Sequence, residues 1–175
     1  MRRGRVSLLG LVLLGLVLLG LTGCAGNHLG PVEDSVAGGR SVEVFPFNNQ
    51  TMQPRFGDAV TQAVRERLQA DGTYHLATHG GGDVVVTGTI KGFRRAGLSY
   101  LSADITTTVN YREEVVAHVV ARESGSGRIV LEKDISGYTL VNVGSDLSSA
   151  DRQAQSLLAD DLARNITQEL TEGKW

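Results

Sequence analysis

The N-terminal stretch limits most strongly what this chain can fold into, because it withdraws residues from any globular core. Arg2, Arg3 and Arg5 precede a run of apolar residues, glycines and one serine from Val6 to Leu21. A basic start followed by a short apolar run is typical of a secretory signal. A membrane-spanning helix needs about 20 predominantly apolar residues, which is more than this run supplies. We therefore expect residues 1–23 to be a signal peptide that is removed.

The run ends in Leu21-Thr22-Gly23-Cys24, which resembles the lipobox of bacterial lipoproteins at all four positions. In lipoproteins the cysteine thiol receives a diacylglyceryl group, and cleavage frees the amine of that cysteine for a further acyl chain. Two or more acyl chains hold a protein stably on a membrane. The resemblance implies that Cys24 is the lipid attachment site. Ala25, not aspartate, follows the cysteine, which implies the outer membrane, with the protein facing the periplasm.

The rest of the chain divides into a tether and one domain. Residues 24–40 hold the acylated cysteine and a Gly-, Ala- and Asn-containing stretch without periodicity, which predicts a flexible tether. Residues 41–175 have the length of a single domain. Without residues 1–23 the chain keeps 14 basic and 19 acidic side chains, a net charge of −5. An acidic domain lacks the basic field of a nucleic-acid-binding protein, so no nucleic-acid partner is expected.

Two segments of the domain have the apolar spacing of a helix, and four alternate like strands. The helices are expected over 56–70, ending at Asp71-Gly72, and from a capping box at 148–151 to Gly173. The strands are expected over 41–47, 83–95, 105–122 and 128–138, with a short one at 74–77. Turns at 48–51 and 124–127 and a polar loop at 141–149 connect them. The last helix carries one apolar stripe, Ala154, Leu157, Leu158, Leu162, Ile166 and Leu170.

Residues 105–122 are long for one strand, since strands usually have three to ten residues. Glu113 also interrupts the row of apolar residues that alternates through Tyr111 and Val115. A bulge or bend near Glu113 would explain both features. Two one-sided helices and a meander with one apolar face bury each other best as a two-layer α+β sandwich. We therefore predict an α+β domain in which two helices pack on one face of a mostly antiparallel sheet.

The sequence offers little that could catalyse a reaction. The histidines, His28, His75, His79 and His118, form no HExxH motif and have no acidic residue at metal-ligand spacing beside them. His79-Gly80-Gly81-Gly82 matches an esterase oxyanion-hole motif, but the G-x-S-x-G nucleophile elbow that this chemistry needs is missing. The chain has one cysteine, so an intramolecular disulfide is excluded, and acylation would consume its thiol. We expect no enzyme, no cofactor and no metal site.

Lys91, Arg94 and Arg95 form the densest basic cluster of the mature chain. Guanidinium groups bind phosphate bidentately, so the cluster is a candidate phosphate-contact site. A solvated strand end is the simpler interpretation of the same residues. Strict strand alternation would place Lys91 and Arg95 on one face and Arg94 on the other, unless a bulge intervenes.

Residues 42–51, Val-Glu-Val-Phe-Pro-Phe-Asn-Asn-Gln-Thr, followed by Pro54 and a helix, resemble the opening of the LPS-assembly lipoprotein family, LptE. In that family a strand ends in Pro-x-Phe-x-Asn-x-Thr before the first helix. Residues 83–90 are similar to the second strand of the family, and the hairpin at 125–127 and the closing helix also fit. One departure is Ala25-Gly26-Asn27 after the cysteine, where the family often has Gly-Tyr.

The resemblance implies a non-enzymatic subunit of the lipopolysaccharide (LPS) transport complex. LptE proteins sit inside the LptD β-barrel, act as plug and assembly factor, and help to place LPS in the outer leaflet of the outer membrane. The expected partners are thus an LptD-like barrel, LPS and, through the lipid anchor, the membrane. Lys91, Arg94 and Arg95 would then be candidate contacts to LPS phosphates. A similar strand opening occurs in other outer-membrane lipoproteins, so an assembly or activator partner of a secretion channel or cell-wall synthase is the alternative.

Overall fold

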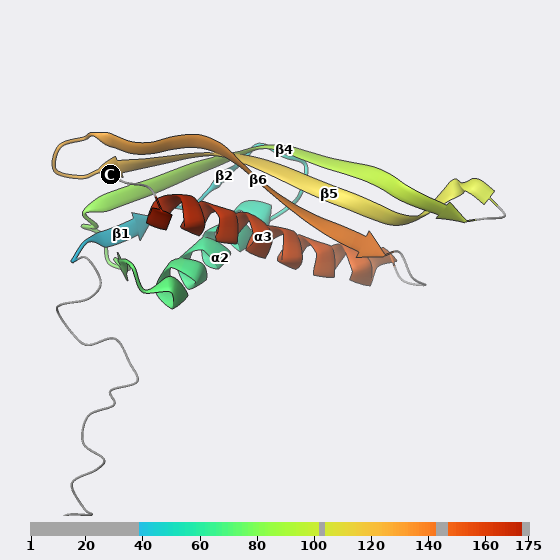
Figure 1. Ribbon diagram of the computed structural model, residues 1–175, viewed down its shortest axis with the longest axis horizontal. Helices are drawn as coiled ribbons and strands as arrows, with labels where there is room; N and C mark the ends of the chain where they lie inside the picture. The colour runs from blue at the N-terminus through green and yellow to red at the C-terminus, as the bar shows by residue number, and fades with distance from the viewer. Residues whose placement is uncertain (1–38, 102–103, 143–146, 173–175) are drawn as a thin grey trace, which may run out of the picture. The chain divides into compact units, whose positions relative to one another are not determined.

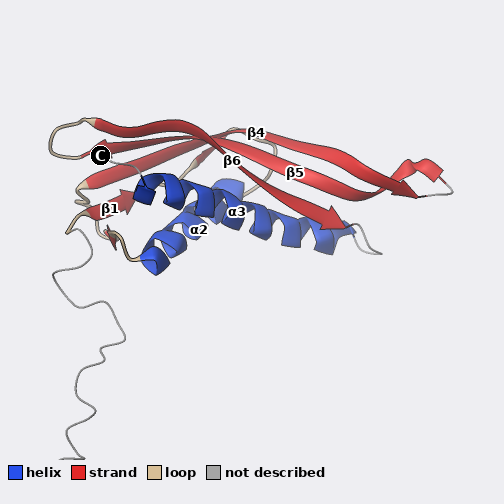
Figure 2. Cartoon of the chain, viewed as in Figure 1, coloured by secondary structure: helices blue, strands red, loops and turns tan. Residues whose placement is uncertain are grey.

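A computed structural model describes residues 39–101, 104–142 and 147–172 of the chain. They belong to the second of two compact units, residues 34–175. The elements in chain order are β1 (Ser41–Val44), β2 (Asn48–Asn49), α2 (Phe56–Asp71), β3 (His75–Leu76), β4 (Val84–Leu101), β5 (Asp104–Glu123), β6 (Ile129–Asn142) and α3 (Leu147–Glu172). Figures 1 and 2 show α2 and α3 together on one side of the sheet. No helix of the described residues is long and apolar enough to cross a membrane.

The sheet has the strand order β3-β1-β4-β5-β6, and β2 adds to β4 beside β1. Strands β1, β2 and β3 run parallel to their neighbours, because α2 provides the crossover that parallel pairing needs. The hairpins β4–β5 and β5–β6 are antiparallel and contribute most of the pairing. The predicted α+β sandwich, with two helices on one face of a mostly antiparallel sheet, is confirmed.

The core lies between the helices and the sheet. Helix α2 buries one face at the predicted spacing, and alternate residues of the central strands face it. These core residues are Val42, Val44, Phe47, Phe56, Val60, Val64, Leu68, Val84, Val86, Ile90, Val115, Ala117, Val119 and Ala121. Gly88 stands in this layer because the Phe47 ring occupies the place of a side chain: a Cβ at Gly88 would lie 2.1 Å from Phe47 Cε1.

Strand β5 corrects the prediction of a bulge near Glu113. It runs without interruption over 20 residues, and Glu113 pairs in register with Arg95 on β4 and Thr139 on β6. The irregularities lie elsewhere: the β4–β5 register shifts between Ile90 and Gly92 and again from Gly97 to Leu101, and the β5–β6 register shifts between Ala121 and Arg122. Glu113 needs no bend because Arg95 neutralises its carboxylate inside the layer.

Helix α3 crosses β6 at very short range. A Cβ on Gly137 would lie 2.7 Å from the backbone nitrogen of Leu162, so only glycine permits this approach. On the edge of β6, the Tyr138 N–H donates to Asp161 Oδ2 at 2.9 Å, and Asn165 Nδ2 donates to the Ser136 carbonyl at 2.8 Å. The helix thereby covers polar groups of an edge strand that could otherwise pair with another chain.

Three further expectations need correction. Asn48 and Asn49 form β2 and not only a turn. Strand β6 runs on to Asn142, and α3 already begins at Leu147, so the predicted capping box falls inside its first turn. Leu157 is 49% exposed, because the buried face of α3 turns toward Ala159 and Ala163, whose small side chains let the helix approach the sheet.

Candidate functional site

The bulge in β4 decides which way the basic cluster points. Lys91 is the extra residue between Ile90, opposite Ala117, and Gly92, opposite Val116. From Phe93 to Gly97, odd-numbered residues of β4 face the helices. Arg95, opposite the buried Glu113, lies on the helix side, whereas Lys91 and Arg94 lie on the side away from α2 and α3, which we call the open face. The three residues therefore do not form one patch, and strict alternation had assigned the faces wrongly.

Arg95 belongs to a structural ion cluster. Its Nε donates to Glu113 Oε1 at 2.6 Å and its Nη2 to Asp151 Oδ1 of α3 at 2.7 Å. Glu113 is only 1% exposed, and the Tyr111 ring centroid lies 5.4 Å from the guanidinium carbon. Burial alone would lower the pKa of Arg95, but the bonds to Glu113 and Asp151 outweigh burial and raise that pKa. The guanidinium thus serves to hold a buried carboxylate and to join β4 to the first turns of α3.

Lys91 belongs to a small cluster of opposite charges on the open face. Its Nζ lies 3.3 Å from Asp134 Oδ1, which also lies 2.7 Å from His118 Nδ1. His118 Nε2 is 3.6 Å from Glu132 Oε1. The hydrogen bond from His118, and then that from Lys91, lower the pKa of Asp134, so this carboxylate stays ionised. Much of the positive charge of Lys91 is balanced locally.

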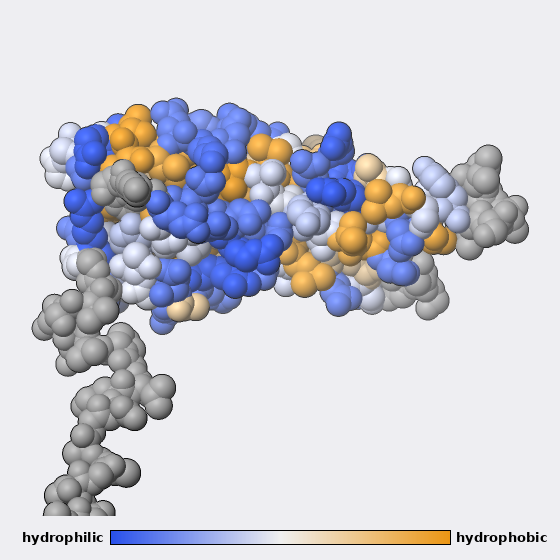
Figure 3. Space-filling model, in the orientation of Figure 1, coloured by the Kyte–Doolittle hydropathy of each residue, from blue (hydrophilic) through white to orange (hydrophobic). Residues whose placement is uncertain are grey.

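Arg94 and Arg112 stand side by side further along the open face. Arg94 is 77% exposed, and its Nη2 donates to Glu114 Oε2 at 2.9 Å. Arg112 places its guanidinium carbon 4.1 Å from the centre of the Tyr138 ring, and Leu140 is the register partner of Arg112 on β6. Tyr138 and Leu140 are at least half exposed. We call Arg94, Arg112, Tyr138 and Leu140 the open-face patch. Figure 3, in the orientation of Figure 1, shows hydrophilic and hydrophobic residues side by side where α3 begins.

The open-face patch combines three kinds of recognition. The guanidinium groups can bind a phosphate through paired N–H donors. A tyrosine ring and a leucine offer apolar surface to a sugar face or an acyl chain. Sequence reasoning missed Arg112, since only the pairing of β4 with β5 and β6 brings it beside Arg94 and Tyr138. The sequence held only a weak signal for this site: Arg112 and Tyr138 both lie at even-numbered positions of predicted strands.

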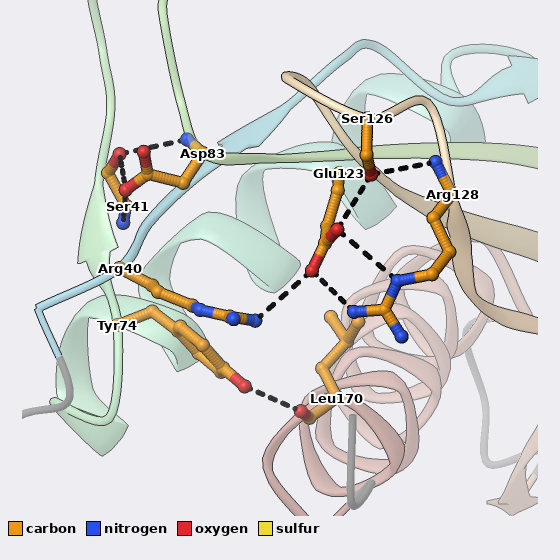
Figure 4. Close-up of polar contacts among 8 residues, drawn as sticks. All are labelled: Arg40, Ser41, Tyr74, Asp83, Glu123, Ser126, Arg128 and Leu170. Carbon is orange, nitrogen blue, oxygen red and sulfur yellow. Dashed lines mark hydrogen bonds and ion pairs between the residues drawn. The ribbon is translucent and has the colours of Figure 1, made fainter.

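A second polar network closes the end of the sheet where β1 begins (Figure 4). Ser41 donates from its backbone nitrogen and its hydroxyl to Asp83 Oδ2, at 2.8 and 2.9 Å. The Glu123 carboxylate accepts hydrogen bonds from Arg128 at 2.6 Å and from the Ser126 hydroxyl at 2.7 Å, and it lies 3.6 Å from the Arg40 guanidinium. These hydrogen bonds, led by that of Arg128, lower the pKa of Glu123 to about 2. The network fixes the predicted 124–127 hairpin and the first residues of the domain.

The remaining candidates show no catalytic grouping. His75 lies on β3, and His118 lies on β5. His79 Nδ1 lies 3.0 Å from the hydroxyl of the neighbouring Thr78. Within residues 39–101, 104–142 and 147–172, no group of three His, Cys, Asp or Glu side chains could hold a metal ion. Cys24 and His28 lie outside the described residues.

Solved structures show the same fold at low sequence identity. A hypothetical protein from Chlamydia trachomatis superposes with a TM-score of 0.58 at 10% identity, over 77% of this chain and 97% of the other. A Xanthomonas campestris protein gives 0.57 at 12% identity, over 83% and 91%. A minor lipoprotein from Acinetobacter baumannii gives 0.52 at 12% identity, over 76% and 93%. No curated protein sequence matches the chain.

The family comparison is more specific than these structural likenesses. The model of the lipopolysaccharide-assembly family LptE matches residues 39–172. That range spans every helix and strand described above, from β1 to the end of α3. Because the match covers well over half of the sequence, the chain belongs to the LptE family of lipopolysaccharide-assembly proteins.

Proposed function

We propose that the chain is a non-enzymatic outer-membrane lipoprotein that acts as plug and assembly partner of an LptD-like β-barrel and helps to place LPS in the outer leaflet. The family match over the whole folded domain carries this proposal. The lipobox at Leu21–Cys24 supports the anchor, and Ala25 supports the outer membrane with the domain in the periplasm. Residues 1–23 act as signal peptide and 24–40 as acylated cysteine and tether.

The anchor is tested at its attachment atom. Cys24→Ser removes the thiol that would accept the diacylglyceryl group, so the precursor should stay uncleaved at Gly23 and incorporate no radiolabelled palmitate. Incorporation of palmitate into this variant would contradict the lipoprotein assignment.

The barrel is tested by co-purification of the native lipidated chain from detergent-solubilised outer membranes. A large β-barrel should be recovered in a fixed ratio with the chain. Recovery of a secretion channel or of a cell-wall synthase in its place would favour the alternative, an assembly or activator lipoprotein of another system.

The open face offers the LPS contact. We assign Lys91, Arg94 and Arg112 to the phosphates, with Tyr138 and Leu140 against sugar or acyl groups. The geometry supports these residues because they share one exposed face of the sheet, whereas Arg95 from the same basic cluster is engaged by Glu113 and Asp151 on the helix side. Charge on the surface of an acidic domain must act locally, so the contact should be sensitive to salt.

The matched test replaces three cations in each of two places. The variant Lys91→Gln/Arg94→Gln/Arg112→Gln should bind purified LPS more weakly and with a shallower salt dependence than the native chain. The control Lys133→Gln/Arg152→Gln/Arg164→Gln removes the same charge from β6 and α3. Both should keep the native melting temperature within a few degrees, since exposed ion pairs contribute little to folding. Equal binding by the two triple variants would refute the open-face assignment.

A further inference from the structure

The open face holds a groove at the end of the sheet where β1 begins. Two rows of side chains cross the strands there: Val85 on β4 stands opposite Arg122 on β5, and Thr87 stands opposite Val120. Phe45, whose N–H donates to the Val86 carbonyl at 3.0 Å, adds its ring beside them and is 45% exposed. The groove has a volume of about 480 Å³. We call these five residues the proximal groove.

The end wall of the proximal groove is rigid. It consists of the hairpin Ser124–Gly127, which also lines the groove. Arg122 Nη1 donates to the Gly127 carbonyl at 2.8 Å, and the Ser124 N–H donates to the Asp83 carbonyl at 2.9 Å. The Glu123 carboxylate, held by Arg128 and Ser126, ties the two sides of the turn together (Figure 4). A preformed wall lowers the entropy cost of binding.

The groove lies at the end of the domain where the described chain begins. Arg40, the second described residue, contacts Glu123 at 3.6 Å, and Glu123 lines the groove. Only 15 residue steps separate Cys24 from Gly39. If these residues form the proposed flexible tether, its root-mean-square span would be roughly 20 Å. An anchored Cys24 would therefore hold the groove close to the lipid leaflet that contains the acyl chains.

The side chains around the groove have the chemistry of a phospholipid site. Val85 and Val120 offer an apolar floor and Phe45 an apolar wall. Ile129, the register partner of Arg122 on β6, is a further exposed apolar residue next to it. The Arg122 guanidinium lies between these apolar groups, where a phosphate headgroup would stand when the acyl chain lies along the valines. The apolar floor can hold the acyl chain of one phospholipid molecule, and the single cation can bind its one anionic phosphate.

We propose that the proximal groove docks on the membrane leaflet that carries the anchor and takes up an acyl chain of a phospholipid from that leaflet, with Arg122 at the phosphate. This inference rests on the proposed lipid anchor at Cys24. It assigns a membrane-facing end to the domain, and it separates the phospholipid contact at this end of the open face from the LPS contact at the open-face patch.

The test places a fluorescent reporter in the groove. Trp175 is the single tryptophan, so the full lipidated chain with Trp175→Phe and Phe45→Trp has one emitter at the groove wall. It is reconstituted in vesicles of phosphatidylethanolamine and phosphatidylglycerol with or without bromine on the acyl chains. Uptake into the leaflet should shift the indole emission to the blue in both kinds of vesicle. Bromine quenches only nearby indoles, so the brominated vesicles alone should also cause a clear loss of emission. The matched control carries Leu140→Trp in the open-face patch and should lose little emission.

Three outcomes overturn the proposal, and two of them concern the reporters: no quenching of the Phe45→Trp reporter, or equal quenching of the Leu140→Trp reporter. Adding Val120→Glu to the Phe45→Trp chain should abolish the quenching, since a carboxylate in the apolar floor repels an acyl chain, and persistence of the quenching also counts against the groove. Val120 lies on the open face and outside the buried core, so this variant should fold, and its melting temperature should match that of the native chain. The vesicles contain neither LPS nor barrel, so failure here leaves barrel co-purification unaffected, and loss of co-purification alone leaves the groove intact.

Discussion

At the end of the sheet where β1 begins, the helices cover one face of every strand, and alternate residues such as Val84, Val119 and Ala121 are fully buried. At the other end, where β4 and β5 extend past α3 in Figure 1, Leu98 and Tyr100 are about half exposed. The first region is stabilised by apolar burial and a self-contained polar network. The second includes the irregular pairing of β4 with β5 from Gly97 to Leu101 and leaves apolar side chains exposed. Stability at the β1 end thus comes from the covered face, whereas both proposed contacts lie on the open face of the sheet. The ion cluster of Arg95 and Glu113 stands at the boundary between the two ends.

The largest effect should come from breaking the covered region. Leu162→Asp places a carboxylate at a fully buried position of α3, against Gly137, and should cost about 3 kcal/mol or more of unfolding free energy. Leu157→Asp is the matched control on the same helix, because Leu157 is half exposed, and should change stability by no more than about 0.5 kcal/mol. Urea denaturation measures both. Similar losses in the two variants would show that the buried stripe of α3 is assigned wrongly.

The boundary can be broken next. Arg95→Met removes the partner of Glu113 and leaves a buried carboxylate uncompensated, which should cost about 3 kcal/mol. Arg94→Met, its neighbour on the open face, breaks only an exposed pair with Glu114 and should cost less than about 1 kcal/mol. Chemical denaturation of both variants gives the difference. If the two losses were equal, Arg95 would be a surface cation and the division of the basic cluster between two faces would be wrong.

The contact of α3 with β6 gives a smaller effect. Gly137→Ala adds a Cβ that would stand 2.7–2.9 Å from Leu162, so the helix must move away and about 2 kcal/mol should be lost. Gly92→Ala in β4 has no atom within 4 Å of the added Cβ and should leave the stability unchanged or slightly raised. Thermal unfolding compares them, and a stable Gly137→Ala variant would show that α3 does not pack as closely as described.

The smallest effect on stability should appear at acid pH, in the polar network around Glu123 at the β1 end of the sheet. Glu123 has a folded pKa of about 2 against an ordinary value of 4.5. The unfolded chain therefore binds more protons in this window. The contribution of Glu123 is complete above about pH 4.5 and is lost as the pH falls toward 2. Glu123→Gln should flatten the fall of melting temperature across that range. Glu114→Gln, at the exposed pair with Arg94, is the control.

Much of the fold followed from local sequence signals. The spacing of Phe56, Val60, Val64 and Leu68 predicted α2, and the Ser-Gly-Ser-Gly sequence predicted the hairpin between β5 and β6. Such signals succeed because side-chain periodicity reflects which face of an element is buried. The family resemblance likewise rested on local motifs, in the β1–α2 opening and in β4, which lie within the matched range. Boundaries such as the ends of β6 and α3 were less accurate, because packing between elements extends them.

The sequence by itself determined the two-layer architecture, the class of the chain as a lipopolysaccharide-assembly protein, and the basic residues worth examining. Only the tertiary structure decided what those residues do. The extra residue Lys91 reverses the face of the residues that follow it up to Gly97, and a bulge leaves no mark that alternation can detect. Whether Glu113 breaks a strand or is neutralised within it depends on Arg95, 18 positions away, and whether Arg112 joins a binding patch depends on strand pairing. These outcomes are set by contacts between distant residues, which periodicity along the chain does not contain.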